Sequence, residues 1–165
     1  MTDLLLTHAK LIDPEGGTVT TGALGITDGR ISAVITGDSP LPEARTKVDC
    51  GRKHLAPGIV DIGVKVCEPG ERHKESFGSA GLAAAAGGVT TMVTRPDTDP
   101  AIDNPETLEF VIRRAREAAP VHVLPMAALT KGRQGREMTE IGFLLDAGAV
   151  AFTDCDNVVR DTKVF

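Results

Sequence analysis

The sequence predicts an α/β fold, with a parallel sheet and intervening helices that follow a small unit of strands alone. From residue 55 onwards, short runs rich in β-branched residues alternate with helix-like segments. This alternation is typical of a parallel sheet. Before residue 55, short apolar runs are separated by turn residues, and no helical segment is evident. Hydrophobic residues make up 41% of the 165 residues, which argues against disorder and is enough for a packed core.

The first predicted unit, residues 1–55, contains short strands and turns. The leucines at 4–6 and Leu11-Ile12 are predicted strands, and the turn residues DPEGG follow them. Residues 23–27 and 31–35 form a predicted hairpin, because the Asp28-Gly29 pair between them suits the positive φ angles of a type I′ turn. Residues 47–49 add a further short strand. No pattern in this unit indicates chemistry.

The second predicted unit, residues 56–165, begins with strand, helix and strand. Residues 59–66 form a nearly continuous β-branched run, as expected for a strand that is buried on both faces. Residues 76–87 are rich in alanine and end at Gly87-Gly88, which is typical of a helix and its C-terminal cap. Residues 89–94 are the next predicted strand.

Two further helices and two further strands are predicted in the rest of this unit. Asn104 is placed as the N-cap of a helix that runs to about residue 119, with Pro105 at its first position. A strand over 121–127, a helix over about 136–147 and a strand over 149–153 complete the pattern.

Four strands with three helices amount to the N-terminal half of a (β/α)₈ barrel, or about four βα units. A complete barrel needs roughly 250 residues. Half a barrel leaves strand edges and one sheet face uncovered, which favours aggregation. We therefore expect the 165 residues to be part of a longer chain, and self-association of half-barrels is the alternative.

Composition excludes several classes of function and compartment. The net charge of −5 provides no basic field for nucleic acid. No apolar run reaches membrane-spanning length, and the N-terminal residues MTDLLLTHAK do not form a signal peptide. The three cysteines are an odd number and widely spaced, which argues against a disulfide framework. A reducing compartment, the cytoplasm, fits best.

Sequence motifs in the second unit resemble those of the dihydroorotases, in the amidohydrolase superfamily. The stretch LAPGIVDIGVKVCEPGERHKESFGSAGLAAAAGGVTTMVTRPDTDPAID is similar to the family pattern PG-x-x-D-x-H-x-H-x-R-E-P-G, then KE, AAAAGG-x-TT and MPNT-x-P. The later stretch ending in AFTD is similar to the family segment AFTDDG. The resemblance covers about residues 1–160. It implies a metal-dependent (β/α)₈ barrel together with a small β-sandwich made from both chain ends.

Five positions depart from this pattern in chemical kind. The two histidines that bind metal in the family fall at Gly63 and Lys65, and a bridging aspartate ligand falls at Cys155. The arginine that binds the substrate carboxylate falls at Cys67, and its asparagine partner falls at Asp97. Glycine has no side chain to donate, and an ammonium group repels a divalent cation. The resemblance therefore implies a protein without the zinc of its active relatives.

The leading interpretation is a catalytically inactive dihydroorotase-like protein of pyrimidine biosynthesis that acts as a structural partner of aspartate carbamoyltransferase. The alternative is an active metal-dependent cyclic amidohydrolase with an altered site. Cys67 and Cys155 are too few ligands for a rebuilt zinc site. We expect Lys65 to take over the charge of a lost metal by pairing with Asp97, Asp154 or Asp156.

Overall fold

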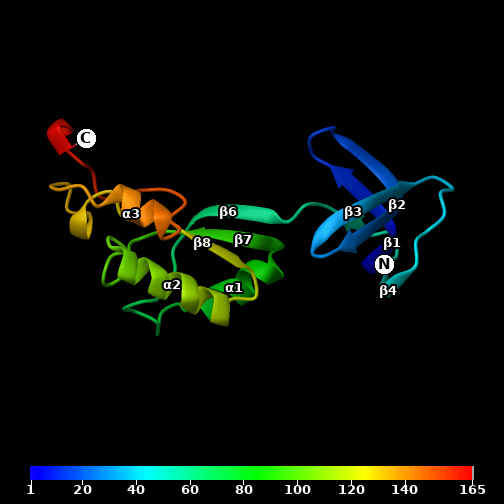
Figure 1. Cartoon of the computed structure of the whole chain (residues 1–165), viewed down its shortest axis with the longest axis horizontal. Coiled ribbons are helices and arrows are strands. Elements are labelled where there is room, and N and C mark those ends of the chain that lie inside the picture. The colour runs from blue at the N-terminus through cyan, green and yellow to red at the C-terminus, as the bar shows by residue number, and fades with distance from the viewer. Residues whose placement is uncertain (165) are drawn as a thin grey trace. The chain divides into compact units, whose positions relative to one another are not determined.

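The computed structural model describes residues 1–164, in two compact units, Met1–Pro57 and Gly58–Phe165. Figure 1 shows the strands of the first unit in blue and cyan and the α/β elements of the second in green to red. Each unit is described by itself. No helix in the described range is long and apolar enough to span a bilayer.

The first unit is a five-stranded sheet in the order β3-β2-β1-β4, with the short strand β5 also pairing with β1. Its strands pair antiparallel within β1-β2-β3, whereas β4 and β5 run parallel to β1. Within residues 1–57 these strands form one sheet, and no second layer of a sandwich is present. The strand bounds are β1 Thr2–Asp13, β2 Thr18–Thr27, β3 Arg30–Thr36, β4 Ala44–Asp49 and β5 His54–Leu55.

The predicted hairpin is confirmed, and two predicted strands prove to be one. Asp28 and Gly29 have φ angles of 51° and 70°, as a type I′ turn between β2 and β3 requires. Leu4–Leu6 and Leu11-Ile12 both belong to β1, which is irregular between Leu6 and Ala9. The residue at this irregularity, His8, has a φ angle of 51°.

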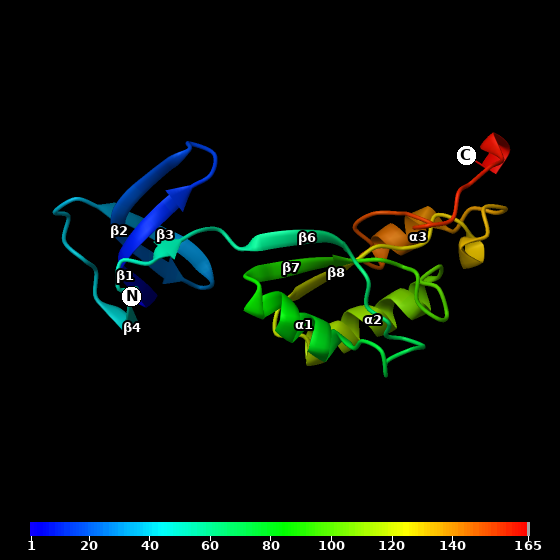
Figure 2. The ribbon, with the colours of Figure 1, turned by 180° about the vertical axis from the view of Figure 1, so that it is seen from behind.

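The second unit contains a parallel three-stranded sheet in the order β6-β7-β8. Helices α1 and α2 lie on the same side of this sheet in both views (Figures 1 and 2). The bounds are β6 Ile59–Val64, α1 Phe77–Ala86, β7 Val89–Thr94, α2 Pro105–Ala118, β8 His122–Pro125 and α3 Ile141–Asp146, with short 3₁₀ turns at Lys131–Arg133 and Thr162–Val164.

Both long helices begin where the sequence predicts. The Ser76 hydroxyl accepts a hydrogen bond from the Ser79 backbone N–H at 3.1 Å and caps α1. The Asn104 side chain accepts one from the Thr107 N–H at 2.9 Å, and Pro105 takes the first position of α2. In each case a side-chain oxygen satisfies a backbone donor that has no partner within the helix.

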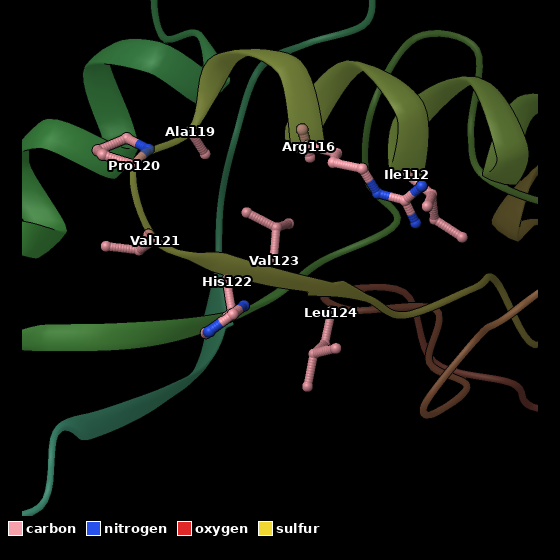
Figure 3. A pocket seen from close by; sticks show the side chains of 9 residues that line it. Ile112, Arg116, Ala119, Pro120, Val121, His122, Val123 and Leu124 are labelled. Carbon is pink, nitrogen blue, oxygen red and sulfur yellow. The ribbon is translucent and has the colours of Figure 1, made fainter. Parts of the chain in front are cut away.

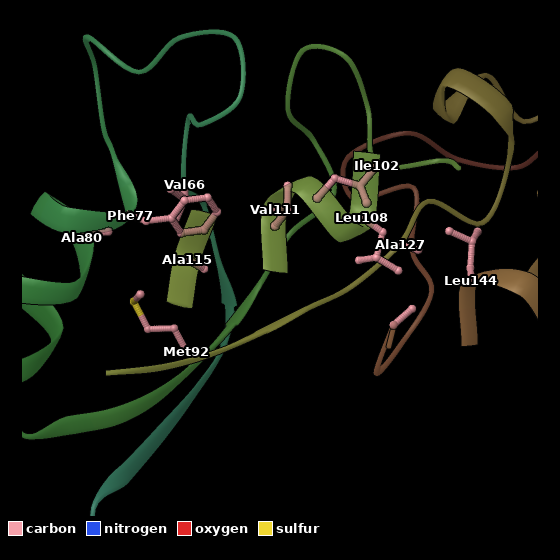
Figure 4. Close-up of a cluster of buried hydrophobic side chains, with 11 residues drawn as sticks. Val66, Phe77, Ala80, Met92, Ile102, Leu108, Val111, Ala115, Ala127 and Leu144 are labelled. Carbon is pink, nitrogen blue, oxygen red and sulfur yellow. The ribbon is translucent and has the colours of Figure 1, made fainter. Parts of the chain in front are cut away.

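The core of the second unit lies between the sheet and its helices (Figure 4). Met92 of β7 contributes one fully buried side chain, and Phe77 of α1 contributes another. Leu108 and Val111 of α2 are also fully buried. These apolar contacts fix the two helices against the strands and so set the position of the strand ends.

The end of the unit differs from the prediction. The fourth predicted strand, 149–153, forms a single bridge between Ala127 and Phe152 instead of a ladder. The segment nevertheless lies beside the end of β8, because Val150 donates its N–H to the Pro125 carbonyl at 3.1 Å and Ala127 donates its N–H to the Ala151 carbonyl at 2.9 Å. The predicted helix from about residue 136 begins only at Ile141, because the preceding residues form a loop with a bridge between Thr130 and Met138.

One face of the three-stranded sheet carries exposed apolar side chains. Ile62, Val93 and Leu124 are in register across the strands; the outer two, Ile62 and Leu124, are 72% and 42% exposed, whereas Val93 on the central strand is buried. Figure 3 shows Val123 pointing toward α2, whereas Leu124 and His122 point to the other side of the sheet. The helices therefore cover one face and leave the other open among the described residues.

Candidate functional site

The three parallel strands bring chemically active residues to one edge of the sheet. Because parallel strands share a direction, the residues that follow their carboxyl ends meet at the same edge. Lys65 follows β6, and Arg95 and Asp97 follow β7. The segment that ends in Asp154, Cys155 and Asp156 passes beside the end of β8, where Thr153 donates its N–H to the Ala127 carbonyl at 3.0 Å.

Four of these side chains form a chain of ion pairs. The Arg95 guanidinium binds both carboxylate oxygens of Asp97, from Nε at 3.2 Å and from Nη2 at 2.9 Å. The Lys65 Nζ lies 3.1 Å from Asp97 Oδ2. Arg95 Nη2 also donates to Asp156 Oδ2 at 2.9 Å. We call these four residues the ionic cluster; it contains two cations and two anions and is neutral as a set.

Asp97 is the centre of the ionic cluster, since its side chain is only 4% exposed and contacts both cations. A buried carboxylate is costly unless it is paired and hydrogen-bonded, and here Arg95 and Lys65 supply that pairing. The hydrogen bond to Asp156 raises the pKa of the Arg95 guanidinium; burial opposes this rise and Asp97 adds to it. Arg95 is therefore a fixed cation at this edge.

The structure selects among the three expected partners of Lys65. Asp97 is the partner, whereas Asp156 pairs with Arg95. Asp154 is buried and has another role: its Oδ1 accepts the backbone N–H groups of Leu129 and Thr130, both at 3.0 Å. Its Oδ2 accepts the Thr130 hydroxyl at 2.5 Å. Asp154 therefore holds the loop after β8 and does not join the ionic cluster.

Sequence reasoning missed Arg95. This residue stands where the family pattern MPNT has methionine, immediately before the proline, and Asp97 stands where the pattern has asparagine. A cation and an anion had thus replaced two uncharged residues at positions two apart. This pair of complementary changes was the signal that could have identified the ion pair.

The two candidate cysteines lie at different places in the unit. Cys155 is half-buried and has a φ angle of 57°. Burial raises the pKa of its thiol, Asp97 raises it further, and Arg95 and Arg133 oppose the rise. Cys67 is half-buried in the loop after β6, where its carbonyl accepts the Glu71 N–H at 2.8 Å. All three cysteines of the chain are free thiols.

Gly63 lies within β6 and has a φ angle of 94°. The pairing between β6 and β7 is irregular at this point, between Ile62 and Val64. A Cβ atom at Gly63 would meet no atom within 4 Å, so backbone conformation, not space, restricts this position.

The donor set at this edge does not fit zinc. Zinc sites use thiolate, imidazole and carboxylate groups, typically three or four together. Here Gly63 has no donor, Lys65 is a cation, Cys155 holds its proton more tightly than usual, and both oxygens of Asp97 contact cations. Within the described residues 1–164, no three His, Cys, Asp or Glu side chains are grouped in a way that would hold a metal ion.

A buried carboxylate positions the loop that leads away from β6. Glu68 Oε2 accepts the backbone N–H of Phe77, the first residue of α1, at 3.0 Å. Its Oε1 accepts Arg114 Nε from α2 at 2.7 Å, and Arg72 Nε lies 3.5 Å away. Burial raises the pKa of Glu68, but the bonds from Arg114 and Phe77 outweigh it, and the net pKa is lowered. Glu68 thus joins β6 to both helices as an anion.

A separate pocket lies along β8 and α2, away from the ionic cluster (Figure 3). Its volume is about 370 Å³, and its lining is mostly apolar, with Arg116 and His122 as the ionisable side chains. No residue of the ionic cluster lines this pocket. Its position beside the strand, and not beyond the strand ends, separates it from the edge where barrel enzymes carry their chemistry.

Comparison with known proteins agrees with the motifs. A dihydroorotase from Caldicellulosiruptor saccharolyticus is 36% identical over 161 residues, which is 98% of this chain and 37% of that protein. A dihydroorotase from Bacillus caldolyticus is 40% identical over 152 residues, 92% of this chain and 32% of that protein. The chain therefore spans about a third of the length of these curated relatives.

A solved structure supports the fold. An L-hydantoinase (dihydropyrimidinase) from Arthrobacter aurescens superposes with a TM-score of 0.78 at 25% identity, over 92% of this chain and 32% of that one. The N-terminal part of the amidohydrolase fold is thus present. The dihydro-orotase-like family model matches residues 52–163, well over half of the chain. The chain therefore belongs to the dihydroorotase family of amidohydrolases.

Proposed function

We propose that this protein is a dihydroorotase-like protein of pyrimidine biosynthesis that has lost metal-dependent hydrolysis and acts as a structural partner of aspartate carbamoyltransferase. The observation that carries the proposal is the ionic cluster. At positions where the family pattern has a metal ligand and a substrate-binding asparagine, Lys65 and Asp97 pair with one another at 3.1 Å.

Loss of turnover follows from the chemistry of these residues. Hydrolysis of a cyclic amide by this family's route requires a metal ion that activates water and polarises the carbonyl group. The Lys65 ammonium opposes a dication at this edge, and Asp97 opposes the carboxylate of the substrate. Cys67 also lacks the planar fork with which arginine binds a carboxylate.

We also propose that the second unit corresponds to the first half of a (β/α)₈ barrel, and that the first unit belongs to a small β-sandwich completed elsewhere. The open face of the β6-β7-β8 sheet, with Ile62 and Leu124 exposed, supports this proposal because such a face is normally covered. The free thiols are compatible with the cytoplasm, where we place the protein.

Metal content and turnover test the loss of catalysis. We expect less than one zinc ion per ten chains by elemental analysis, and no conversion of dihydroorotate above background. The double variant Gly63→His, Lys65→His should remain inactive, because Cys67 provides no cation for the substrate carboxylate and Arg95 is already paired with Asp97 and Asp156. Stoichiometric zinc, or turnover on the order of 1 s⁻¹, would instead establish the alternative, an active cyclic amidohydrolase with an altered site.

Co-purification tests the partnership. Mixed with aspartate carbamoyltransferase, the full-length protein should elute as one complex whose mass exceeds that of either component in size-exclusion chromatography with light scattering. Separate elution at micromolar concentration, with unchanged transferase activity, would refute the structural role without affecting the conclusion about zinc.

A further inference from the structure

A second pocket, which is polar, lies beyond the ionic cluster, between the loop after β8 and the C-terminal segment. It is formed by residues 132–136 on one side and 156–160 on the other, and its volume is about 530 Å³. This volume is within the range of sites for small molecules. The lining is mostly polar, and three arginines, Arg133, Arg136 and Arg160, contribute to it.

Hydrogen bonds hold the two sides of this pocket together. The Asn157 side-chain amide donates to the Arg133 carbonyl at 2.8 Å and so ties the C-terminal segment to the loop. Within the loop, the Gly135 N–H donates to the Thr130 hydroxyl at 2.8 Å, and the Gly132 N–H donates to the Asp103 carboxylate at 2.7 Å. Arg133 and Arg136 are therefore presented by a loop with a defined conformation, and Arg160 lies on the C-terminal segment that is tied to this loop.

The charges of the pocket are unbalanced. None of its three guanidinium groups lies within 4 Å of a carboxylate in the described part of the chain. Arg133 Nε makes one long contact, 3.4 Å, with the Asp154 carbonyl. Asp156 is the single carboxylate in the lining, and Arg95 already binds it from the ionic cluster at 2.9 Å. The pocket thus retains unused positive charge.

From this geometry we propose that the pocket binds the phosphate group of a small phosphorylated molecule. Guanidinium groups bind phosphate through pairs of parallel N–H···O bonds, and several arginines around one cavity match the several oxygens of that group. The gathering of three guanidinium groups around one pocket favours a compact anion over an extended acidic chain. This proposal does not depend on the proposed loss of turnover, and the two are tested by separate experiments.

Calorimetric titration of the full chain with inorganic phosphate tests the proposal. We expect saturable binding, weakened about tenfold or more by Arg136→Ala and by Arg160→Ala, since each removes charge-assisted hydrogen bonds. Arg113→Ala, an exposed arginine on α2, removes the same charge elsewhere and should leave the affinity within about twofold. Unchanged far-UV circular dichroism would show that the variants fold.

Three results would overturn the proposal. The first is the absence of saturable phosphate binding, and the second is an equal loss of affinity in Arg113→Ala and Arg136→Ala. The third is a preference for another anion: succinate binding more tightly than phosphate would identify a dicarboxylate site. Tight binding of an oligoglutamate peptide without phosphate binding would likewise identify a surface for an acidic protein segment.

Discussion

Replacing Glu68 by alanine should destabilise the second unit by about 3 kcal/mol. The Glu68 side chain is 5% exposed, and the Phe77 residue whose N–H it accepts is 1% exposed. A buried N–H that loses its acceptor costs roughly 1–3 kcal/mol, and a hydrogen bond to a charged group is worth roughly 1.5–3 kcal/mol. The sum of these two contributions is reduced, because Arg114 does not lose all its partners: its side chain is 27% exposed to water, and Glu117 lies 3.9 Å away.

Urea unfolding followed at 222 nm measures this loss. All three α-helices lie in the second unit, so the signal reports on that unit, and the absence of Trp and Tyr leaves little intrinsic fluorescence to follow. Glu71→Ala is the matched control, because it removes an exposed carboxylate whose single ion pair among residues 1–164 is with Lys74. The control should lose much less stability than Glu68→Ala, because an exposed ion pair contributes little. Equal losses in Glu68→Ala and Glu71→Ala would refute the bridging role of Glu68.

Three further predictions concern the same unit. Stability should depend on pH through Glu68: its folded pKa is lowered, so its contribution is present above the unfolded value of about 4.3 and is lost as pH falls through the folded pKa. The difference in unfolding free energy between wild type and Glu68→Gln should accordingly shrink between pH 6 and pH 3, and a constant difference would contradict this. Arg95→Ala should cost about 2–4 kcal/mol by leaving Asp97 buried with one partner, whereas Lys65→Ala, whose side chain is 55% exposed, should cost less than about 1 kcal/mol by urea unfolding. Leu108→Ala should cost about 3 kcal/mol, because a fully buried leucine leaves a cavity; a loss below about 1 kcal/mol would place Leu108 outside the core.

Local sequence patterns predicted most of the helices and strands, because the interactions that start and end these elements join residues close together in the sequence. Ser76 and Asn104 mark the starts of α1 and α2 through hydrogen bonds that span only three residues. The Asp28-Gly29 turn is likewise set by the φ angles that these two residues tolerate. Such features need no knowledge of distant contacts.

The elements that were predicted wrongly depend on distant partners. Residues 149–153 have the composition of a strand and form backbone hydrogen bonds with residues 125–127, but the pairing is reduced to a single bridge at Phe152. The loop at 130–140 takes residues that were expected in α3, because Asp154, 24 residues from Thr130, fixes its start. A short stretch of sequence does not contain both partners of such a contact, so local patterns cannot predict it.

The candidate site was predicted in part. The resemblance to the family located Lys65 and Asp97, and charge alone suggested that Lys65 pairs with a carboxylate. Which of three carboxylates it meets depends on how β6 and β7 end side by side, and that was settled only in three dimensions. Arg95 was not predicted, because it is not one of the five positions at which a metal ligand or substrate contact of the family pattern is replaced.

The left-handed backbone at Gly63 has an evolutionary consequence. With a φ angle of 94°, this position suits glycine, and any side chain restored there is opposed by about 1 kcal/mol or more of backbone strain. A histidine that reappeared by mutation would thus reduce stability before zinc could offer any compensating benefit, since Lys65 and Asp97 still occupy the neighbouring positions. Under the proposed loss of the metal site, the backbone conformation at Gly63 therefore makes a return to histidine energetically unfavourable.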